Sequence, residues 1–244
     1  MFKVPTTWSL ERSVSTIGVA IALIVVALSA FDASALPSCA NLQKRWYSHY
    51  ITDVGVSWDT SIFICDDKSK GKLKGAEAII ALSLYDLETA KIPKVKSGNR
   101  PNFYTIVKRD IEELTFSADC RPRVLAKTNG STITLCQDFL KDSREDRAST
   151  LVHEARHTEY DDPRHVICNG GKYSDQSQGC DETFHNGLWS GSGYNADVYF
   201  YFWSLKKGAK NELSRSVMQG MINSMVPDRF NVISPKVARQ WRGK

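Results

Sequence analysis

Two histidines flank a glutamate within one short segment, His153-Glu154-Ala155-Arg156-His157. Residues four apart lie on the same face of an α-helix, so His153 and His157 can direct ring nitrogens to a single metal ion. Imidazole nitrogens suit Zn²⁺, which binds them at about 2.0 to 2.1 Å. Glu154 would then stand beside the metal without ligating it, a place that suits a general base acting on a metal-activated water. The segment therefore predicts a zinc site with Glu154 as the catalytic residue.

A catalytic zinc site needs a third protein ligand and keeps one position open for water. His165, which follows shortly after His157, is the preferred third ligand. A turn at Asp161-Asp162-Pro163 can bring the chain back towards the helix that carries the first two histidines. Six other residues stay open as alternatives: Asp161, Asp162, Asp181, Glu182, His185 and Asp197.

The residues before the motif predict the helix that presents it. Ser143 and Asp146 form a capping box, so the helix should begin near Ser143. Thr150 and the motif residues fall on one side of this helix, and we expect that side to face a cleft. Apolar residues at helical spacing predict the opposite, core-facing side: Ala148, Leu151, Val152 and Ala155.

Three further helices are predicted. Gly75 to Lys91 and Asn211 to Met225 have the apolar spacing of amphipathic helices. Tyr194 to Leu205 is apolar or aromatic nearly all round, as in a helix buried in a core. Asp197 within it has two open interpretations. It contacts a ligand histidine or the metal itself, or it lies with Asn195 in an exposed first turn, where acids are favoured.

Short strands are predicted between these helices. Val124–Ala126 and Thr132–Leu135 should form a hairpin across Asn129-Gly130, because Asn-Gly fits the positive φ angles of tight turns. Phe103 to Val107 and Ile111 to Phe116 are also interpreted as strands, since they combine aromatic and β-branched residues.

Residues 1–35 predict a secretory signal peptide. A polar, basic start precedes the apolar run Ile17 to Phe31, and Ala33-Ser34-Ala35 has the small-x-small pattern of a cleavage site. The run is shorter than the roughly 20 residues of a transmembrane helix. A retained membrane anchor and lipidation of Cys39 stay open as alternatives. We expect residues 36–244 to form a single mature domain that is secreted or periplasmic.

Cysteine usage and composition support this interpretation. The chain has six cysteines, and pairing them locally predicts the disulfides Cys39–Cys65, Cys120–Cys136 and Cys168–Cys180. With 42% hydrophobic and 24% charged residues, disorder and a multi-span membrane architecture are excluded. The net charge of +5 is smaller than that of a typical nucleic-acid binder. We therefore expect a monomer without a nucleic-acid partner and without stable membrane insertion.

Several segments together resemble the deuterolysin and peptidyl-Lys metalloendopeptidase group, the aspzincins, among the zincin metallopeptidases. The resemblance covers residues 115–205. The segments that carry it are Thr132–Cys136, Phe139, Thr150–His157, Asn195–Asp197, Tyr199 and Phe202. It implies an α+β, zincin-like fold, in which a small mixed sheet packs on the zinc-binding helix and a following core helix and disulfides stabilise the domain. It also implies a small secreted endopeptidase with one zinc ion.

The chain departs from known zincin patterns around the third ligand. Aspzincins take that ligand from a Gly-Thr-x-Asp-x-x-Tyr-Gly segment, which this sequence lacks, and metzincin spacing would place it at Pro163. His165 stands near the place of the aspzincin Asp, so we interpret it as a substituted ligand in a three-histidine site. In aspzincins, lysine specificity is associated with acidic residues on the helix that carries Asn-Ala-Asp. Phe200, one turn after Asp197, is not acidic, so a lysine preference is not expected.

These features predict a zinc-dependent endopeptidase that hydrolyses peptide bonds in protein or peptide substrates. Zn²⁺ held by His153, His157 and His165 would activate water and polarise the scissile carbonyl, with Glu154 as general base. Tyr194 and Tyr173 are the candidates for stabilising the oxyanion. The alternative is a noncatalytic envelope or adhesion protein that retains a zincin scaffold, marked by a closed site with four ligands or by no zinc.

Overall fold

The structure is a computed structural model that describes residues 37–59, 63, 75–90, 102–158, 164–170, 179–184, 191–206, 215–233 and 239. All of these residues belong to one compact unit, Leu36–Lys244. The predicted signal peptide and Cys65 lie outside them. Within the described ranges, no helix combines the length and the apolar character needed to cross a membrane.

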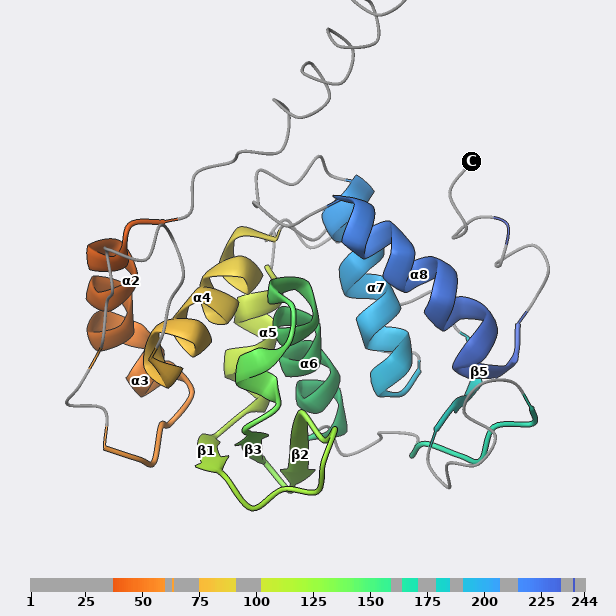
Figure 1. Ribbon diagram of the computed structural model, residues 1–244, viewed down its shortest axis with the longest axis horizontal. Coiled ribbons are helices and arrows are strands. Elements are labelled where there is room, and N and C mark those ends of the chain that lie inside the picture. Colours follow the sequence, from red (N-terminus) through yellow and green to blue (C-terminus); the bar gives the residue numbers. More distant parts are fainter. Residues whose placement is uncertain are drawn as a thin grey trace, which may run out of the picture. The chain divides into compact units, whose positions relative to one another are not determined.

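This unit consists mostly of helices, and a small mixed sheet lies at its edge, below α5 and α6 in Figure 1. The helices in chain order are α2 (Cys39–Arg45), the π-helix η1 (Trp46–Tyr50), α3 (Ile51–Asp53), α4 (Ala76–Thr89), α5 (Phe103–Asp110), the 3₁₀ helix η3 (Phe139–Lys141), α6 (Arg144–His157), α7 (Gly193–Lys206) and α8 (Arg215–Asp228). The strands are β1 (Glu113–Ser117), β2 (Ala126–Asn129), β3 (Thr132–Cys136), β4 (Asp181–Thr183) and β5 (Phe230–Val232). The expected mixture of helices and a small mixed sheet is confirmed.

The main sheet has the strand order β1-β3-β2, which places β2 at one edge. Strands β1 and β3 are parallel, and β2 is antiparallel to β3. The predicted hairpin is confirmed, because β2 and β3 meet across Gly130, whose φ of 61° needs the freedom of glycine. A second sheet pairs β4 with β5 in parallel.

The predicted strand at Phe103–Val107 is wrong, since these residues begin helix α5. Asn102 caps the helix by accepting a hydrogen bond from the Thr105 amide at 2.8 Å. Phe103 packs edge-on against Phe200 of α7 with ring centroids 5.1 Å apart, so a β-branched, aromatic segment is used here as a buried helical face. The second predicted strand, Ile111–Phe116, is found with shifted limits as β1.

The helices predicted from apolar spacing are present. Helix α4 lies within Gly75–Lys91, α7 matches Tyr194–Leu205, and α8 overlaps Asn211–Met225, of which residues 211–214 lie outside the described part. Helix α6 lies between α5 and α7 in Figure 1. An ion pair anchors its start to α4, because Arg144 Nε donates to the buried Asp86 carboxylate at 2.6 Å.

Two predicted disulfides are confirmed, Cys120–Cys136 and Cys168–Cys180. Cys39 is also disulfide-bonded, and its predicted partner, Cys65, lies outside the described residues. The Cys168–Cys180 bond joins the segment after His165 to the residue before β4, beside a backbone bridge between Val166 and Cys180. This bond therefore stabilises the segment that carries His165.

Candidate metal centre

Helix α6 presents the motif residues as the sequence predicts. Ser143 is its N-cap and accepts a hydrogen bond from the Asp146 amide at 3.0 Å. The predicted apolar stripe is completely buried: Ala148, Leu151, Val152 and Ala155. The other side borders a cleft of about 760 Å³ that is lined by Thr150, His153, Glu154 and His157. The cleft predicted beside the motif is therefore confirmed.

Three histidines converge on one point in this cleft. The Nε2 atoms of His153 and His157 are 3.2 Å apart, and each lies 3.0 Å from Nε2 of His165. Two ligands bound at about 2.0 to 2.1 Å in a tetrahedron stand about 3.3 to 3.4 Å apart, close to these separations. The arrangement therefore fits a metal ion, and the three histidines form a group that can hold one.

Buried carboxylates hold two of the rings from behind. Nδ1 of His153 lies 2.7 Å from Oδ2 of Asp197, and Nδ1 of His165 lies 2.7 Å from Oδ1 of Asp181. A proton on each Nδ1 leaves the Nε2 lone pair free for a metal, so these contacts select the ligating tautomer. The sequence leaves both Asp181 and Asp197 possible as direct metal ligands. In the structure, their carboxylates instead contact the Nδ1 side of two histidine rings.

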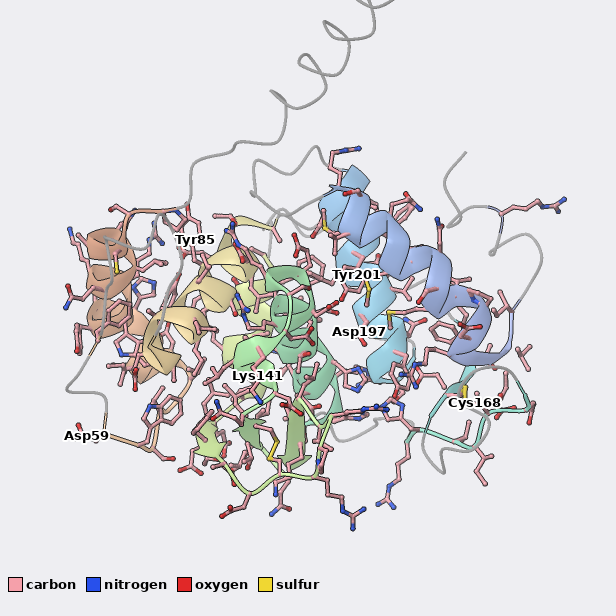
Figure 2. The ribbon with its side chains drawn as sticks, viewed as in Figure 1. Asp59, Tyr85, Lys141, Cys168, Asp197 and Tyr201 are labelled. Atoms are coloured by element: carbon pink, nitrogen blue, oxygen red, sulfur yellow. A yellow bond between two sulfur atoms is a disulfide. The ribbon has the colours of Figure 1, made fainter. Side chains whose placement is uncertain are left out.

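The buried environment of Asp197 overturns one interpretation of it. The residue is only 7% exposed, so its placement in an exposed first turn is wrong. It also accepts a hydrogen bond from the Ser149 hydroxyl of α6. In Figure 2, Asp197 lies on α7 beside α6. The contact with His153 matches the other interpretation, in which this carboxylate orients a ligand histidine.

Burial also sets the protonation of this pair. It raises the pKa of the Asp197 carboxyl well above its usual range, although the Ser149 hydrogen bond acts in the opposite direction. Burial, together with repulsion from His157 and His165, lowers the pKa of His153 to about 3. His153 is therefore neutral near pH 7, which is the form of imidazole that ligates a metal.

Asp181 connects the second sheet to the metal centre. It is buried at the start of β4, and its Oδ2 accepts a hydrogen bond from the Asn195 amide near the start of α7 at 2.9 Å. Its other oxygen holds His165. Glu182 is exposed and lies within 3.4 Å of an Asn231 side-chain nitrogen instead. The remaining alternatives, Asp161, Asp162 and His185, lie outside the described residues.

Glu154 lines the cleft but is not part of the histidine group. Its side chain is largely buried and accepts a hydrogen bond from the Thr128 hydroxyl on β2. The edge strand therefore positions this carboxylate. Among the described residues, Glu154 is thus outside the group of possible metal ligands, as the sequence predicts.

Other residues lie around the histidine cluster, and only some of them have a signal in the sequence. Tyr194, already a candidate, has its ring centroid 4.3 Å from that of His165, whereas Tyr173 lies outside the described residues. The Arg229 guanidinium lies 4.4 Å from the Tyr194 ring centroid and donates to the Gly179 carbonyl. No local pattern marks Thr128, Ser149 or Arg229, because their contacts arise between distant segments.

Comparisons of the chain with protein-family models, with curated proteins and with solved structures found no match. The functional assignment therefore depends on the cleft itself. Within the described part of the chain, that cleft is lined by three convergent histidines and Glu154, and the buried carboxylates of Asp197 and Asp181 lie behind two of the histidines.

Proposed function

We propose that the protein is a secreted, zinc-dependent endopeptidase of the zincin type, related to the aspzincins. The observation that carries this proposal is the convergence of three Nε2 atoms, 3.0 to 3.2 Å apart, beside Glu154 in an open cleft. Imidazole ligands suit zinc and disfavour magnesium or calcium, which prefer oxygen. His153, His157 and His165 would hold the ion, which when bound supplies a Lewis acid and acidifies water.

Glu154 is the general base in this proposal. Its carboxylate takes a proton from the water as the water oxygen bonds to the carbonyl carbon, and it then gives that proton to the amide nitrogen, so the carbon–nitrogen bond breaks and the amine leaves. The Thr128 hydroxyl donates to one carboxylate oxygen and leaves the other available for the water. Tyr194, whose ring lies against His153 and His165, is the candidate for stabilising the oxyanion.

The edge strand favours peptides as substrates. Strand β2 is at the edge of the main sheet, and residues 123–128 line the cleft together with the histidines. An extended peptide can pair with such an edge through main-chain hydrogen bonds, which recognise the backbone irrespective of sequence. A carbonyl of that peptide would then lie next to the metal centre.

Disulfides support the proposed secretion. The described residues contain the Cys120–Cys136 and Cys168–Cys180 bonds, and disulfides persist mainly in oxidising compartments.

Metal analysis joined to a peptidase assay tests the proposal. We expect the purified protein to contain one zinc per chain and to cleave an unstructured protein such as denatured casein. A chelator should abolish the cleavage, and added Zn²⁺ should restore it. A protein that binds zinc but cleaves no peptide before or after reconstitution would support the noncatalytic alternative instead.

A further inference from the structure

Cationic side chains surround the cleft that contains the histidines. Arg123 and Lys127 belong to the β2 region, Arg164 directly precedes His165, and Arg229 follows α8. In Figure 1, β2 lies below α6, and β5 lies beside the lower end of α8. The positive residues that line the cleft therefore come from parts of the fold that are far apart in the sequence.

Three of these cations are available to a ligand. Arg123, Lys127 and Arg164 are exposed, and none of them forms an ion pair with another residue in the described ranges. Arg229 is held more firmly by Tyr194 and the Gly179 carbonyl. An unpaired guanidinium beside a cleft can bind a carboxylate through two parallel hydrogen bonds.

Within the described part of the chain, the acidic residues that line the cleft are Glu154 and Asp197. Both are buried, so they do not offset the positive charge at the open surface of the cleft. Glu154 accepts from Thr128, whereas Asp197 contacts Ser149 and His153. Both carboxylates thus face donors within the protein.

The backbone holds Arg123 at the edge of the cleft. Its φ of 68° makes it the non-glycine residue with positive φ among those described, a conformation that side chains disfavour. The Arg123 amide donates to the Asp138 carboxylate at 2.8 Å, which fixes this turn just before β2. The contact with Asp138 therefore fixes the course of the backbone at Arg123.

A smaller adjoining cavity of about 220 Å³ is lined by several acidic residues, but their carboxylates accept hydrogen bonds from groups within the protein. Asp146 accepts a hydrogen bond from the Tyr201 hydroxyl at 2.7 Å, and Asp142 accepts one from the Ser143 amide at 2.8 Å. Burial raises the pKa of the Asp142 carboxyl, and repulsion from Asp146 acts in the same direction. The exposed cations Arg123, Lys127 and Arg164 line the larger cleft, which also contains the histidines.

We propose that this cleft selects peptides with Asp or Glu side chains close to the scissile bond, and that Arg123 and Arg164 are its specificity-determining residues. A peptide paired with β2 would pass between these two guanidinium groups. The inference rests on the proposed peptidase function, because it assigns a substrate class to the same cleft. A preference for acidic side chains near the scissile bond is a property that the three histidines alone do not provide.

Binding of charged peptides tests the inference without requiring turnover. Three fluorescein-labelled peptides would alternate Ala with Glu, Gln or Lys, and fluorescence anisotropy would measure their binding to zinc-loaded Glu154→Gln protein. We expect the Glu peptide to bind at least about fivefold more tightly than the Gln peptide, since it can form two or more exposed ion pairs. The Lys peptide should bind most weakly, and high salt should reduce the preference.

Substitutions identify the residues responsible. Arg123→Gln and Arg164→Gln should each lower the Glu-to-Gln affinity ratio by about two- to fivefold, as expected for one exposed ion pair. Arg121→Gln is the matched control, because Arg121 is exposed in the same loop but does not line the cleft, and it should keep the ratio. Equal binding of the Glu and Gln peptides, a preference for Lys, or an unchanged ratio in both cleft variants would overturn the inference.

Cleavage of the same peptides by the wild-type protein separates this inference from the proposed function. If the Glu peptide binds more tightly but is not cleaved, and casein is not cleaved either, the peptidase assignment fails and the acidic-peptide site stands. If peptides are cleaved and bound without regard to charge, the peptidase assignment stands and the specificity fails.

Discussion

Glu154 and the histidines line one cleft, but different groups hold them. Glu154 accepts a hydrogen bond from Thr128 on the edge strand, whereas His153 and His165 contact buried carboxylates. Both histidine rings are thus oriented from behind with Nε2 facing the shared point, and Glu154 stays outside that group. Metal binding and proton transfer should therefore be separable by mutation.

Glu154→Gln should leave the zinc content near that of the wild type and abolish peptide hydrolysis. The amide keeps the size of the side chain and can still pair with Thr128, but it cannot accept a proton from water. General-base catalysis typically contributes about 10²- to 10⁴-fold, so a loss of at least this size is expected. His157→Ala should lose zinc and activity together. Elemental analysis and an activity assay measure both, and loss of metal from Glu154→Gln would refute its role as a base.

The carboxylates behind the histidines should matter less for metal affinity than a ligand does. We expect His165→Ala to weaken zinc binding drastically. Asp181→Asn and Asp197→Asn should weaken it by about 10- to 100-fold, as is typical for partners of metal ligands. Competition with a chromogenic chelator gives all three affinities. Zinc retained by His165→Ala but lost from Asp197→Asn would instead place the third ligand on α7.

At the scale of elements, the predictable parts are those with local signals. The Ser143 cap and the apolar stripe predicted α6, and Asn129-Gly130 predicted the β2–β3 hairpin. The segment from Phe103 was misassigned because its residue types favour strands, while the Asn102 cap and packing on α7 make it helical. Tertiary context overrides intrinsic propensity in such short segments.

Helix α7 begins at Gly193, where a larger side chain would have no room. A Cβ atom at Gly193 would lie 2.5 Å from Nε2 of His153, closer than side chains tolerate. Gly193→Ala should therefore displace the His153 ring from the metal position and weaken zinc binding by at least about 10-fold, comparable to the loss of a partner of a ligand. Chelator competition measures this effect, and unchanged affinity would show that the ring can move without cost.

Gly220 in α8 is the matched control for that substitution. A Cβ atom there meets nothing within 4 Å, and the position is exposed. Gly220→Ala should leave zinc affinity unchanged and stabilise the protein by about 0.5 to 1 kcal/mol, because alanine favours a helix interior over glycine. Urea unfolding measures the gain.

At the scale of the whole molecule, the candidate metal centre is assembled from segments far apart in the sequence. Helix α6 provides two histidines, the disulfide-bonded segment before β4 provides His165, and α7 and β4 provide the carboxylates behind them. The motif on α6 could be identified from sequence because its spacing is local. The convergence of His165 with these two histidines could not be predicted from local spacing, because the fold brings His165 to them and places Asp181 behind it.

The two described disulfides have similar loop sizes but different positions relative to this centre. Cys168 and Cys180 are separated by 12 residues and close the segment that carries His165, whereas Cys120 and Cys136 are separated by 16 and close the hairpin region. Loops of this size predict a similar stabilisation for each bond, about 3 kcal/mol in the chain-entropy model. They should nevertheless differ in their effect on metal binding.

Replacing both cysteines of each pair by serine tests this difference. Both double variants should lose about 2 to 4 kcal/mol of unfolding free energy, measured by urea unfolding of the metal-free protein. Only the Cys168→Ser/Cys180→Ser variant should also lose zinc affinity, because His165 then belongs to a looser segment that must be ordered when the metal binds. Chelator competition compares the two variants under conditions where both are folded. Equal losses of affinity would show that the bonds act through general stability, and an unchanged affinity in the Cys168/Cys180 variant would show that the contact with Asp181 alone keeps His165 in place.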